Sequence, residues 1–401
     1  MRNRVLFQML IAVAMLGWAE CGGGCPAGSP QTGSGSGATG GGNSAKGTTC
    51  GPGTNPGGGA STAALLYYLG TSNILGATLS TTGIFAPLPG FTPPTLPSSV
   101  GNDMVIVNKK FLYLPQSDSL TIQGFTIDHS AGALTAIAGS PFATAGADSV
   151  ASDPAGHFLF VGNRNAGSIS VFQINPTTGA LVAAPGSPFF AFNLDFAAVL
   201  AVDGTGKFLY VSQNLPPLPI YGFSIDQNTG ALSPVVGSPF SLNVAGVRTD
   251  FLGKFAVGIT GNTGDNHLYV FAIDPTTGAL AAVNNSPFTT VASTPLNLQI
   301  HPSSQFVYSF GLDSNSVYTA MEGYAIDPTT GALTALAGSP FTAPPIVAFC
   351  KWDQAGAEAF CANAATPAFS ILGTNTSTGA LTHTVTDLTV PSNAVPFAPT
   401  D

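Results

Sequence analysis

The stretch Phe-Gln-Ile-Asn-Pro-Thr-Thr-Gly-Ala-Leu, residues 172–181, decides the fold because the chain repeats it. Four close copies begin at Phe125, Phe223, Phe271 and Tyr324. About five residues after each copy comes the phrase Ser-Pro-Phe. Two degenerate copies flank the set, and the seven aligned glycines are Gly83, Gly132, Gly179, Gly230, Gly278, Gly331 and Gly379. Their successive spacings of 49, 47, 51, 48, 53 and 48 residues predict seven repeats, a number typical of β-propellers.

Each unit divides into four predicted β-strands. In the second full unit these are residues 148–152, 157–161, 168–174 and 180–184, which alternate apolar residues and are rich in β-branched and aromatic ones. The Asn-Pro-Thr-Thr-Gly phrase is typical of a hairpin turn, since Asn caps the turn, Pro fixes φ and Gly adopts the left-handed conformation. The equivalent aspartates are therefore predicted to be turn residues, not catalytic ones: Asp128, Asp226, Asp274 and Asp327.

The ends of the repeat region predict how the ring closes. Residues 65–69 match a second strand, so the first blade lacks its inner strand. The segment 393–397, around Val395, follows the seventh unit and can supply that strand. We therefore expect an all-β, seven-bladed propeller of four-stranded antiparallel blades, closed by a C-terminal strand that completes the first blade.

Composition excludes several other classes of protein. Only 7% of the 401 residues are charged, against about 25% in ordinary globular proteins, so exposed helix faces are improbable. The net charge of −9 provides no basic patch for a phosphate backbone, and we expect no nucleic-acid partner.

The N-terminal region predicts export. Residues 1–20 combine Arg2 and Arg4 with an apolar run to Leu16, as in a signal peptide. Residues 21–60 form a Gly/Ser/Pro-rich tether, and the propeller occupies residues 61–401. Two processing routes remain open: lipidation of Cys21, or cleavage before Glu20. The protein is expected in the cell envelope, lipid-anchored, or secreted or periplasmic, with membrane contact only through an N-terminal lipid anchor.

Five cysteines suit an oxidising compartment. Two strands joined by a turn near Ala355 would place Cys350 opposite Cys361, close enough for a cross-strand disulfide. If Cys21 carries lipid, Cys25 and Cys50 are left to pair with each other.

Candidate binding residues are expected on one face of the ring. We call it the channel face: the loops from second to third strand, such as 163–167, and from blade to blade, such as 190–198. The opposite turn face carries the turns 153–156 and 175–179. The candidate ligand-binding residues of the channel face are Arg164, Asp195, Arg248, Asp265, His267 and Glu322. Such a mixture of charges could bind a small polar or sugar-like ligand, or another envelope protein.

Standard catalytic signatures are absent from the sequence. It has no Gly-x-Ser-x-Gly, phosphate loop, His-Glu-x-x-His, Cys-x-x-Cys or calcium loop. We therefore expect neither a metal nor a cofactor.

The repeated phrases, joined to Asp-Pro-Ala-Gly-His-Phe-Leu-Phe-Val-Gly-Asn at 153–163, resemble the seven-bladed propeller lactonase family over about residues 62–401. That family is typified by 6-phosphogluconolactonase and is related to surface-layer YVTN-type propeller repeats. The resemblance implies a seven-bladed propeller and a lactone hydrolase with His, Arg and Glu on the channel face, and the N-terminal signal would make this chain an exported bacterial member. The starts of the inner strands contain no Arg-Pro-Arg-His-like phrase, so no catalytic residue is carried over by position.

Three functional interpretations follow. The first is an exported, membrane-tethered binding or scaffold module. The second is a divergent lactonase, a carboxylic ester hydrolase like 6-phosphogluconolactonase. The third is a surface-layer or adhesion-type structural protein. Convergence of an acid, a base and a cation on the channel face would favour the lactonase.

Overall fold

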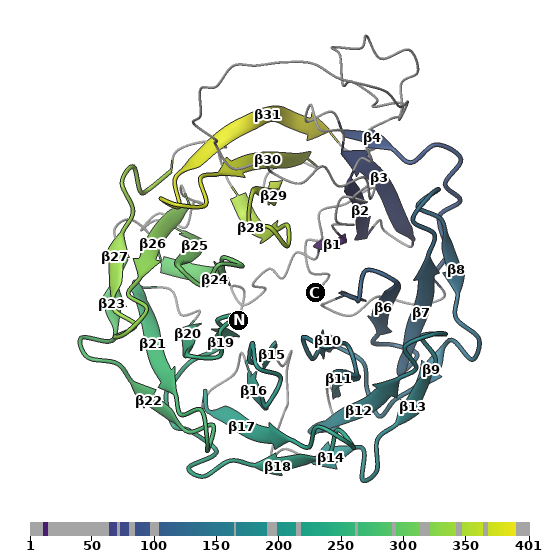
Figure 1. The fold of residues 1–401 in the computed structure, drawn as a ribbon, viewed down its shortest axis with the longest axis horizontal. Helices are drawn as coiled ribbons and strands as arrows, with labels where there is room; N and C mark the ends of the chain where they lie inside the picture. The colour runs from purple at the N-terminus through teal and green to yellow at the C-terminus, as the bar shows by residue number, and fades with distance from the viewer. Residues whose placement is uncertain are drawn as a thin grey trace, which may run out of the picture.

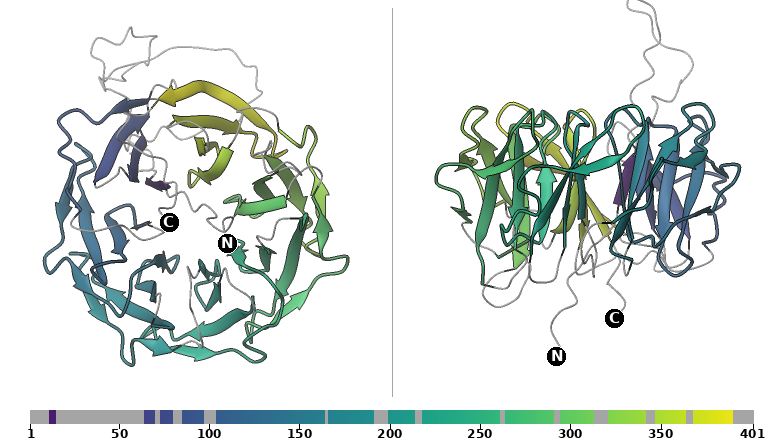
Figure 2. Two further views of the ribbon diagram at one scale, coloured as in Figure 1. Left: turned by 180° about the vertical axis from the view of Figure 1, so that it is seen from behind. Right: turned by 90° about the horizontal axis from the view of Figure 1, so that it is seen from below.

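The computed structural model describes residues 11–14, 64–69, 73–79, 85–96, 104–163, 166–190, 199–213, 218–260, 264–290, 294–312, 321–341, 347–363 and 368–389. These residues form strands and turns arranged in seven antiparallel sheets, or blades, around a central axis (Figure 1). The first strand of each blade lies nearest the axis and the last lies at the rim, and the side view shows a flat disc (Figure 2). The predicted all-β, seven-bladed propeller is confirmed.

The blades use the strands in chain order. Blade 1 contains β1 (Ile11–Ala14), β2 (Ala64–Leu69), β3 (Ile74–Leu79) and β4 (Phe85–Pro87). Blade 2 contains β5 (Val105–Val107), β6 (Phe111–Gln116), β7 (Thr121–Ile127), β8 (Leu134–Ala136) and β9 (Phe142–Ala143). Blade 3 contains β10 (Ser149–Ser152), β11 (Phe158–Asn163), β12 (Ser168–Ile174), β13 (Leu181–Ala183) and β14 (Phe189–Phe190). Blade 4 contains β15 (Val199–Val202), β16 (Phe208–Ser212), β17 (Ile220–Ile225) and β18 (Leu232–Pro234).

The remaining blades follow the same plan. Blade 5 contains β19 (Gly246–Thr249), β20 (Phe255–Ile259), β21 (His267–Ile273), β22 (Leu280–Ala282) and β23 (Phe288–Thr289). Blade 6 contains β24 (Thr294–Ile300), β25 (Phe306–Leu312), β26 (Glu322–Ile326) and β27 (Leu333–Ala335). Blade 7 contains β28 (Val347–Trp352), β29 (Glu358–Asn363), β30 (Ala368–Thr374) and β31 (Leu381–Thr389).

In blades 2 to 6 the Ser-Pro-Phe phrase ties the rim of the blade to its third strand. In blade 3 the Ser187 hydroxyl accepts the backbone N–H of Val171 at 2.9 Å, and Phe189 pairs with Ile169. In blade 5 the Ser286 hydroxyl accepts the N–H of Val270 at 2.9 Å. The phrase therefore continues the outer edge of the sheet after the short fourth strand ends.

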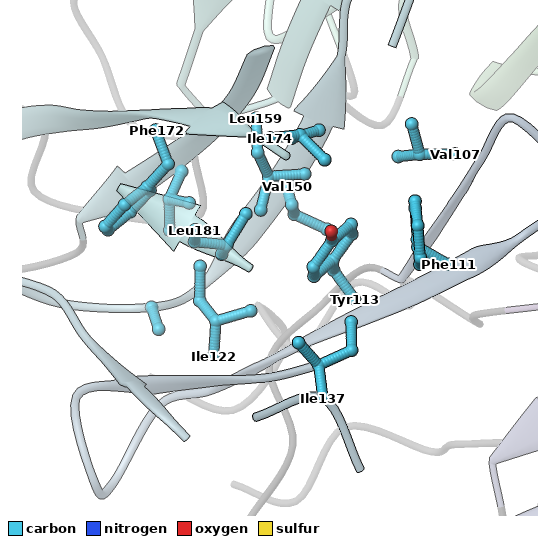
Figure 3. Close-up of a cluster of buried hydrophobic side chains, with 12 residues drawn as sticks. Val107, Phe111, Tyr113, Ile122, Ile137, Val150, Leu159, Phe172, Ile174 and Leu181 are labelled. Carbon is cyan, nitrogen blue, oxygen red and sulfur yellow. The ribbon is translucent and has the colours of Figure 1, made fainter. Parts of the chain in front are cut away.

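The hairpin glycine joins neighbouring blades. Gly179 has φ of +73°, and a Cβ there would lie 2.5 Å from Phe111 of blade 2. Only glycine therefore allows both this turn and this close approach. The buried Tyr113 hydroxyl donates a hydrogen bond to the Gly179 carbonyl at 2.6 Å, and burial raises the pKa of this phenol. Side chains from both blades form the apolar core between them (Figure 3).

The closing strand differs from the predicted one. In the structure β1, residues 11–14 of the expected signal peptide, pairs with the inner edge of β2, with Ile11 opposite Tyr68 and Ala14 opposite Leu65. The open edge of β2 accepts a short apolar segment irrespective of its origin, because the pairing uses backbone groups. Residues 393–397 lie outside the described residues, so closure by them stays a prediction.

Strand spacing supports the C-terminal segment 393–397 as the closing strand of blade 1. In three consecutive blade-to-blade steps the next inner strand starts 14 residues after the start of the fourth strand: Leu232 to Gly246, Leu280 to Thr294 and Leu333 to Val347. Fourteen residues after Leu381, where β31 starts, is Val395.

A buried histidine stabilises the turn face between blades 6 and 7. His301 is fully buried, its Nε2–H donates to the Gly356 carbonyl at 2.8 Å, and its Nδ1 accepts the N–H of Ser303 at 3.1 Å. Burial lowers the pKa of His301 and outweighs the opposing effects of the Gly356 carbonyl and Asp353. The ring is therefore neutral, with its proton on Nε2.

We expect the two candidate closing strands to be separable by truncation. A chain starting at Cys21 should melt within a few degrees of the full chain, because residues 393–397 replace β1. Removing residues 392–401 as well should lower the melting temperature by about 5–10 °C, through roughly four lost backbone hydrogen bonds. Equal melting temperatures of the two truncated chains, measured by calorimetry, would contradict closure by the C-terminus.

Stability should decrease on acidification because of His301. Below about pH 6.5 the unfolded chain binds a proton that the folded chain, with its lowered His301 pKa, does not yet bind. The stabilisation is complete above that pH and is lost as the pH falls from there through the lowered pKa of folded His301. Urea midpoints between pH 5 and 8 should show a weaker pH dependence for His301→Gln than for wild type. The exposed His129→Gln is the control, and a wild-type pH dependence in His301→Gln would refute the assignment.

Candidate functional site

The structure places four of the six predicted binding residues in blades 5 and 6. Arg248 lies in β19, Asp265 precedes β21, His267 begins β21 and Glu322 begins β26. Arg164 and Asp195 lie outside the described residues. The same is true of Cys21, Cys25 and Cys50, whereas Cys350 and Cys361 face each other in β28 and β29 and form a disulfide with a Cα–Cα distance of 4.0 Å.

Asp265 and His267 form a hydrogen-bonded pair. His267 Nδ1 lies 2.7 Å from Asp265 Oδ1. The other carboxylate oxygen, Oδ2, accepts the Thr260 hydroxyl at 2.7 Å and the Tyr269 hydroxyl at 3.1 Å. Burial raises the pKa of Asp265, but the hydrogen bonds from Thr260, His267 and Tyr269 outweigh it, so the net pKa is lowered. An ionised Asp265 therefore fixes the imidazole orientation through Nδ1–H.

The other nitrogen of His267 is available to a ligand. The side chain of His267 is 35% exposed and that of Asp265 20%. Among the described residues, Nε2 of His267 has no hydrogen-bond partner. With Nδ1–H directed at Asp265, Nε2 carries a lone pair, which is the arrangement of a general base.

Strand periodicity positions this pair. His267 and Tyr269 are two residues apart in β21, so their side chains share a face with Phe271. Phe271 packs against Phe208 and Tyr210 of blade 4. The pair therefore lies at the channel-face end of the interface between blades 4 and 5, away from the ring axis.

Glu322 is a fully buried carboxyl group at the next interface. The Tyr324 hydroxyl donates a hydrogen bond to its Oε2, and Ser309 lies directly opposite it in the sheet. Tyr324 belongs to the core between blades 5 and 6, and Glu322 shares its face of β26. Burial of a carboxyl group is costly, so Glu322 is a strong candidate for a functional role.

Arg248 faces the same interface as Glu322. It lies opposite Val257, which belongs to the core between blades 5 and 6. Its guanidinium donates to the Val247 carbonyl at 3.3 Å. The structure thus pairs Asp265 with His267 on one side of blade 5, and directs Arg248 and Glu322 to its other side.

Sequence reasoning missed Thr260 and Tyr269. The repeat could have revealed them, because Thr260, His267 and Tyr269 occupy the positions that Asn163, Ser168 and Ser170 occupy in blade 3. There the Asn163 amide donates to the hydroxyls of Ser168 at 3.0 Å and Ser170 at 2.8 Å. Polar groups at these three positions therefore form hydrogen-bonded clusters in both blades.

Two features are absent from the described part of the chain. Its His, Cys, Asp and Glu side chains nowhere gather in a group of three or more that could hold a metal ion. It also contains no helix with the length and apolar character needed to span a membrane.

Comparison with known proteins identifies the family. The family described as "Lactonase, 7-bladed beta-propeller" matches residues 91–187 and 238–350. This chain belongs to that family. No curated protein matches it.

Solved structures of similar fold share little sequence with this lactonase-family chain. A candidate 6-phosphogluconolactonase from Bacteroides fragilis has 20% identity and a TM-score of 0.59, covering 81% of this chain and 93% of its own. A second candidate from Bacteroides uniformis has 18% identity and a TM-score of 0.60, covering 79% and 92%. The periplasmic gluconolactonase of Pseudomonas aeruginosa has 15% identity and a TM-score of 0.58, covering 80% and 94%. At these identities the likeness establishes the fold alone.

Proposed function

We propose that this protein is a lactone hydrolase acting outside the cytoplasm, with His267 as its general base. One observation carries the proposal: Asp265 holds Nδ1 of His267 at 2.7 Å, which leaves the Nε2 lone pair to accept a proton. Membership of the lactonase family supports this chemistry.

The reaction needs one water molecule and no other reactant. Nε2 of His267 accepts a proton from water while the water oxygen attacks the lactone carbonyl carbon. Asp265 stabilises the resulting imidazolium, as the carboxylate of a hydrolase triad does. The tetrahedral intermediate then breaks its ring C–O bond, and His267 returns the proton to the departing ring oxygen. The product is the open hydroxy acid.

The substrate class we propose is an unphosphorylated sugar lactone. Two similar structures bear the name 6-phosphogluconolactonase and a third is named a periplasmic gluconolactonase. An exported enzyme would meet sugar lactones outside the cell, where phosphorylated metabolites are scarce. Hydroxyl and amide groups on the channel face suit the hydroxyls of such a ligand.

A second candidate function is binding without catalysis, as a scaffold module of the envelope. This function is favoured by buried polar atoms near the channel face that have no hydrogen-bond partner among the described residues: Gln116 Nε2, Ser149 Oγ, Asn163 Oδ1 and Ser212 Oγ. Such groups could hold sugar hydroxyls although none is a base.

Hydrolysis of D-glucono-1,5-lactone by purified variants tests the first proposal. His267→Gln should lower kcat/KM by about 100-fold or more, because general bases contribute 10²–10⁴-fold. Asp265→Asn should lower it at least about tenfold, since the imidazole loses its orienting charge. His129→Gln, an exposed histidine of the turn face, should be unchanged. Full activity of His267→Gln would refute the assignment, and saturable sugar binding without turnover in wild type would establish the second function instead.

We also propose that Cys21 carries the lipid anchor. The tether 21–60 would then allow the propeller to reach about 35 Å from the membrane. Two or more acyl chains give stable anchoring, since each buried methylene contributes about 0.8 kcal/mol and one chain binds only marginally.

Fractionation of cells tests the anchor. Cys21→Ser should move the protein from the membrane to the soluble fraction, while its melting temperature stays that of the wild type. Cys25→Ser is the matched control and should remain in the membrane fraction. A wild-type mature N-terminus at Glu20, determined by mass spectrometry, would show simple secretion.

A further inference from the structure

A cavity of about 330 Å³ lies between blades 5 and 6 on the turn face. Its walls come from the β19–β20 turn, the β24–β25 turn and the start of the hairpin after β26. The apolar part consists of Leu252, Phe255, Phe306, Ile326 and Pro328. Its volume is in the range of small-molecule sites, which are mostly apolar with a few polar groups.

The turn of blade 5 packs toward blade 4, as the equivalent turns of other blades pack on the blade before them. A Cβ on Gly253 would lie 2.7 Å from Asp203 and Thr205, so this turn touches the preceding one. The side chains at its tip, Phe251 and Leu252, are 55% and 57% exposed. They do not fill the space toward blade 6, and Leu252 instead forms the lip of the cavity.

The blade 6 wall carries an unsatisfied hydroxyl. Ser304 has φ of +60°, in the left-handed region where the turns of blades 3, 4, 5 and 7 have glycine. Its side chain is only 8% exposed, and within the described part of the chain Oγ has no hydrogen-bond partner. A strained, buried serine with a free hydroxyl is costly to the fold, which points to a ligand.

A cation lies at the rim. The Lys254 ammonium donates to the Pro328 carbonyl at 3.3 Å, and an ammonium has three N–H donors. Asp250 also lines the cavity, but its carboxylate is turned to the backbone, where Oδ1 accepts N–H groups of Lys254 at 2.7 Å and Phe255 at 3.0 Å. Lys254 is therefore the cation available to an entering molecule, although its charge also interacts with Asp250.

We infer that this cavity is a binding site for a small aromatic or branched aliphatic carboxylate. The apolar group would contact Phe255, Phe306 and Leu252. The carboxylate would accept hydrogen bonds from Lys254 and, after a small shift of the atoms that now cover it, from the Ser304 hydroxyl. The site lies on the face opposite His267, so it is independent of the proposed hydrolase function.

Benzoate titration of the full chain, followed by calorimetry and melting temperature, tests this site. Wild type should bind benzoate saturably and melt at a higher temperature in its presence, since a ligand of the folded state stabilises it. Lys254→Met keeps the aliphatic stem and should weaken benzoate binding by about tenfold, as expected for loss of a charged hydrogen bond. The neutral analogue benzyl alcohol should bind Lys254→Met as well as it binds wild type.

The repeat offers a matched control. Lys207 precedes Phe208 in blade 4 as Lys254 precedes Phe255 in blade 5, but it does not line the cavity. Lys207→Met should therefore bind benzoate like wild type. Ser304→Gly, which suits the left-handed conformation, should weaken benzoate binding without loss of the fold. Equal affinities of Lys254→Met and Lys207→Met, or no saturable binding by wild type, would overturn the inference and make the cavity a packing void.

Discussion

The propeller depends on one repeated contact between neighbouring blades. In blades 2 to 7 the hairpin glycine packs on an apolar residue at the start of the second strand in the blade before it. The described pairs are Leu65–Gly132, Phe111–Gly179, Phe158–Gly230, Phe208–Gly278, Phe255–Gly331 and Phe306–Gly379. Tyrosine hydroxyls reinforce four of these contacts by donating to the glycine carbonyls. Since each blade completes the core of another, no blade buries its apolar surface alone.

Turns on the turn face use eight of the nineteen acidic side chains. Asp226 in a hairpin turn accepts N–H groups of Asn228 and Thr229, and Asp203 accepts the N–H of Phe208. Hydrogen bonds from Thr229 and Asn228 lower the pKa of Asp226, so it is ionised for structural reasons. Only 7% of the residues are charged, so an acidic side chain that forms no turn hydrogen bond is a candidate for a functional role. Asp265 and Glu322 are two such acids.

The sequence predicted the fold well because its determinants are local and repeated. The Asn-Pro-Thr-Thr-Gly turn, the strand patterns and the placement of Cys350 opposite Cys361 all depend on short-range spacing. What could not be predicted depends on which blade a side chain faces. A shift of one residue moves a side chain to the other face of its strand. The assembled ring was therefore needed to show that Arg248 and Glu322 face one interface of blade 5 and His267 the other. The pairing of β1 with β2 was not predicted, because an open strand edge can pair with many different apolar segments.

Comparison of blades 3 and 5 shows how such a repeat can acquire chemistry. Both have polar residues at the same three strand positions, and in blade 3 these are the neutral Asn163, Ser168 and Ser170. In blade 5 the loop between these positions spans residues 261–266, two residues longer than 164–167 in blade 3. That longer loop contains Asp265, the acid that orients His267. The strands thus provide a fixed polar frame, and the longer loop carries the acid that, under the proposed function, makes His267 a base. The proposed base of this chain therefore lies where a longer loop interrupts the repeat.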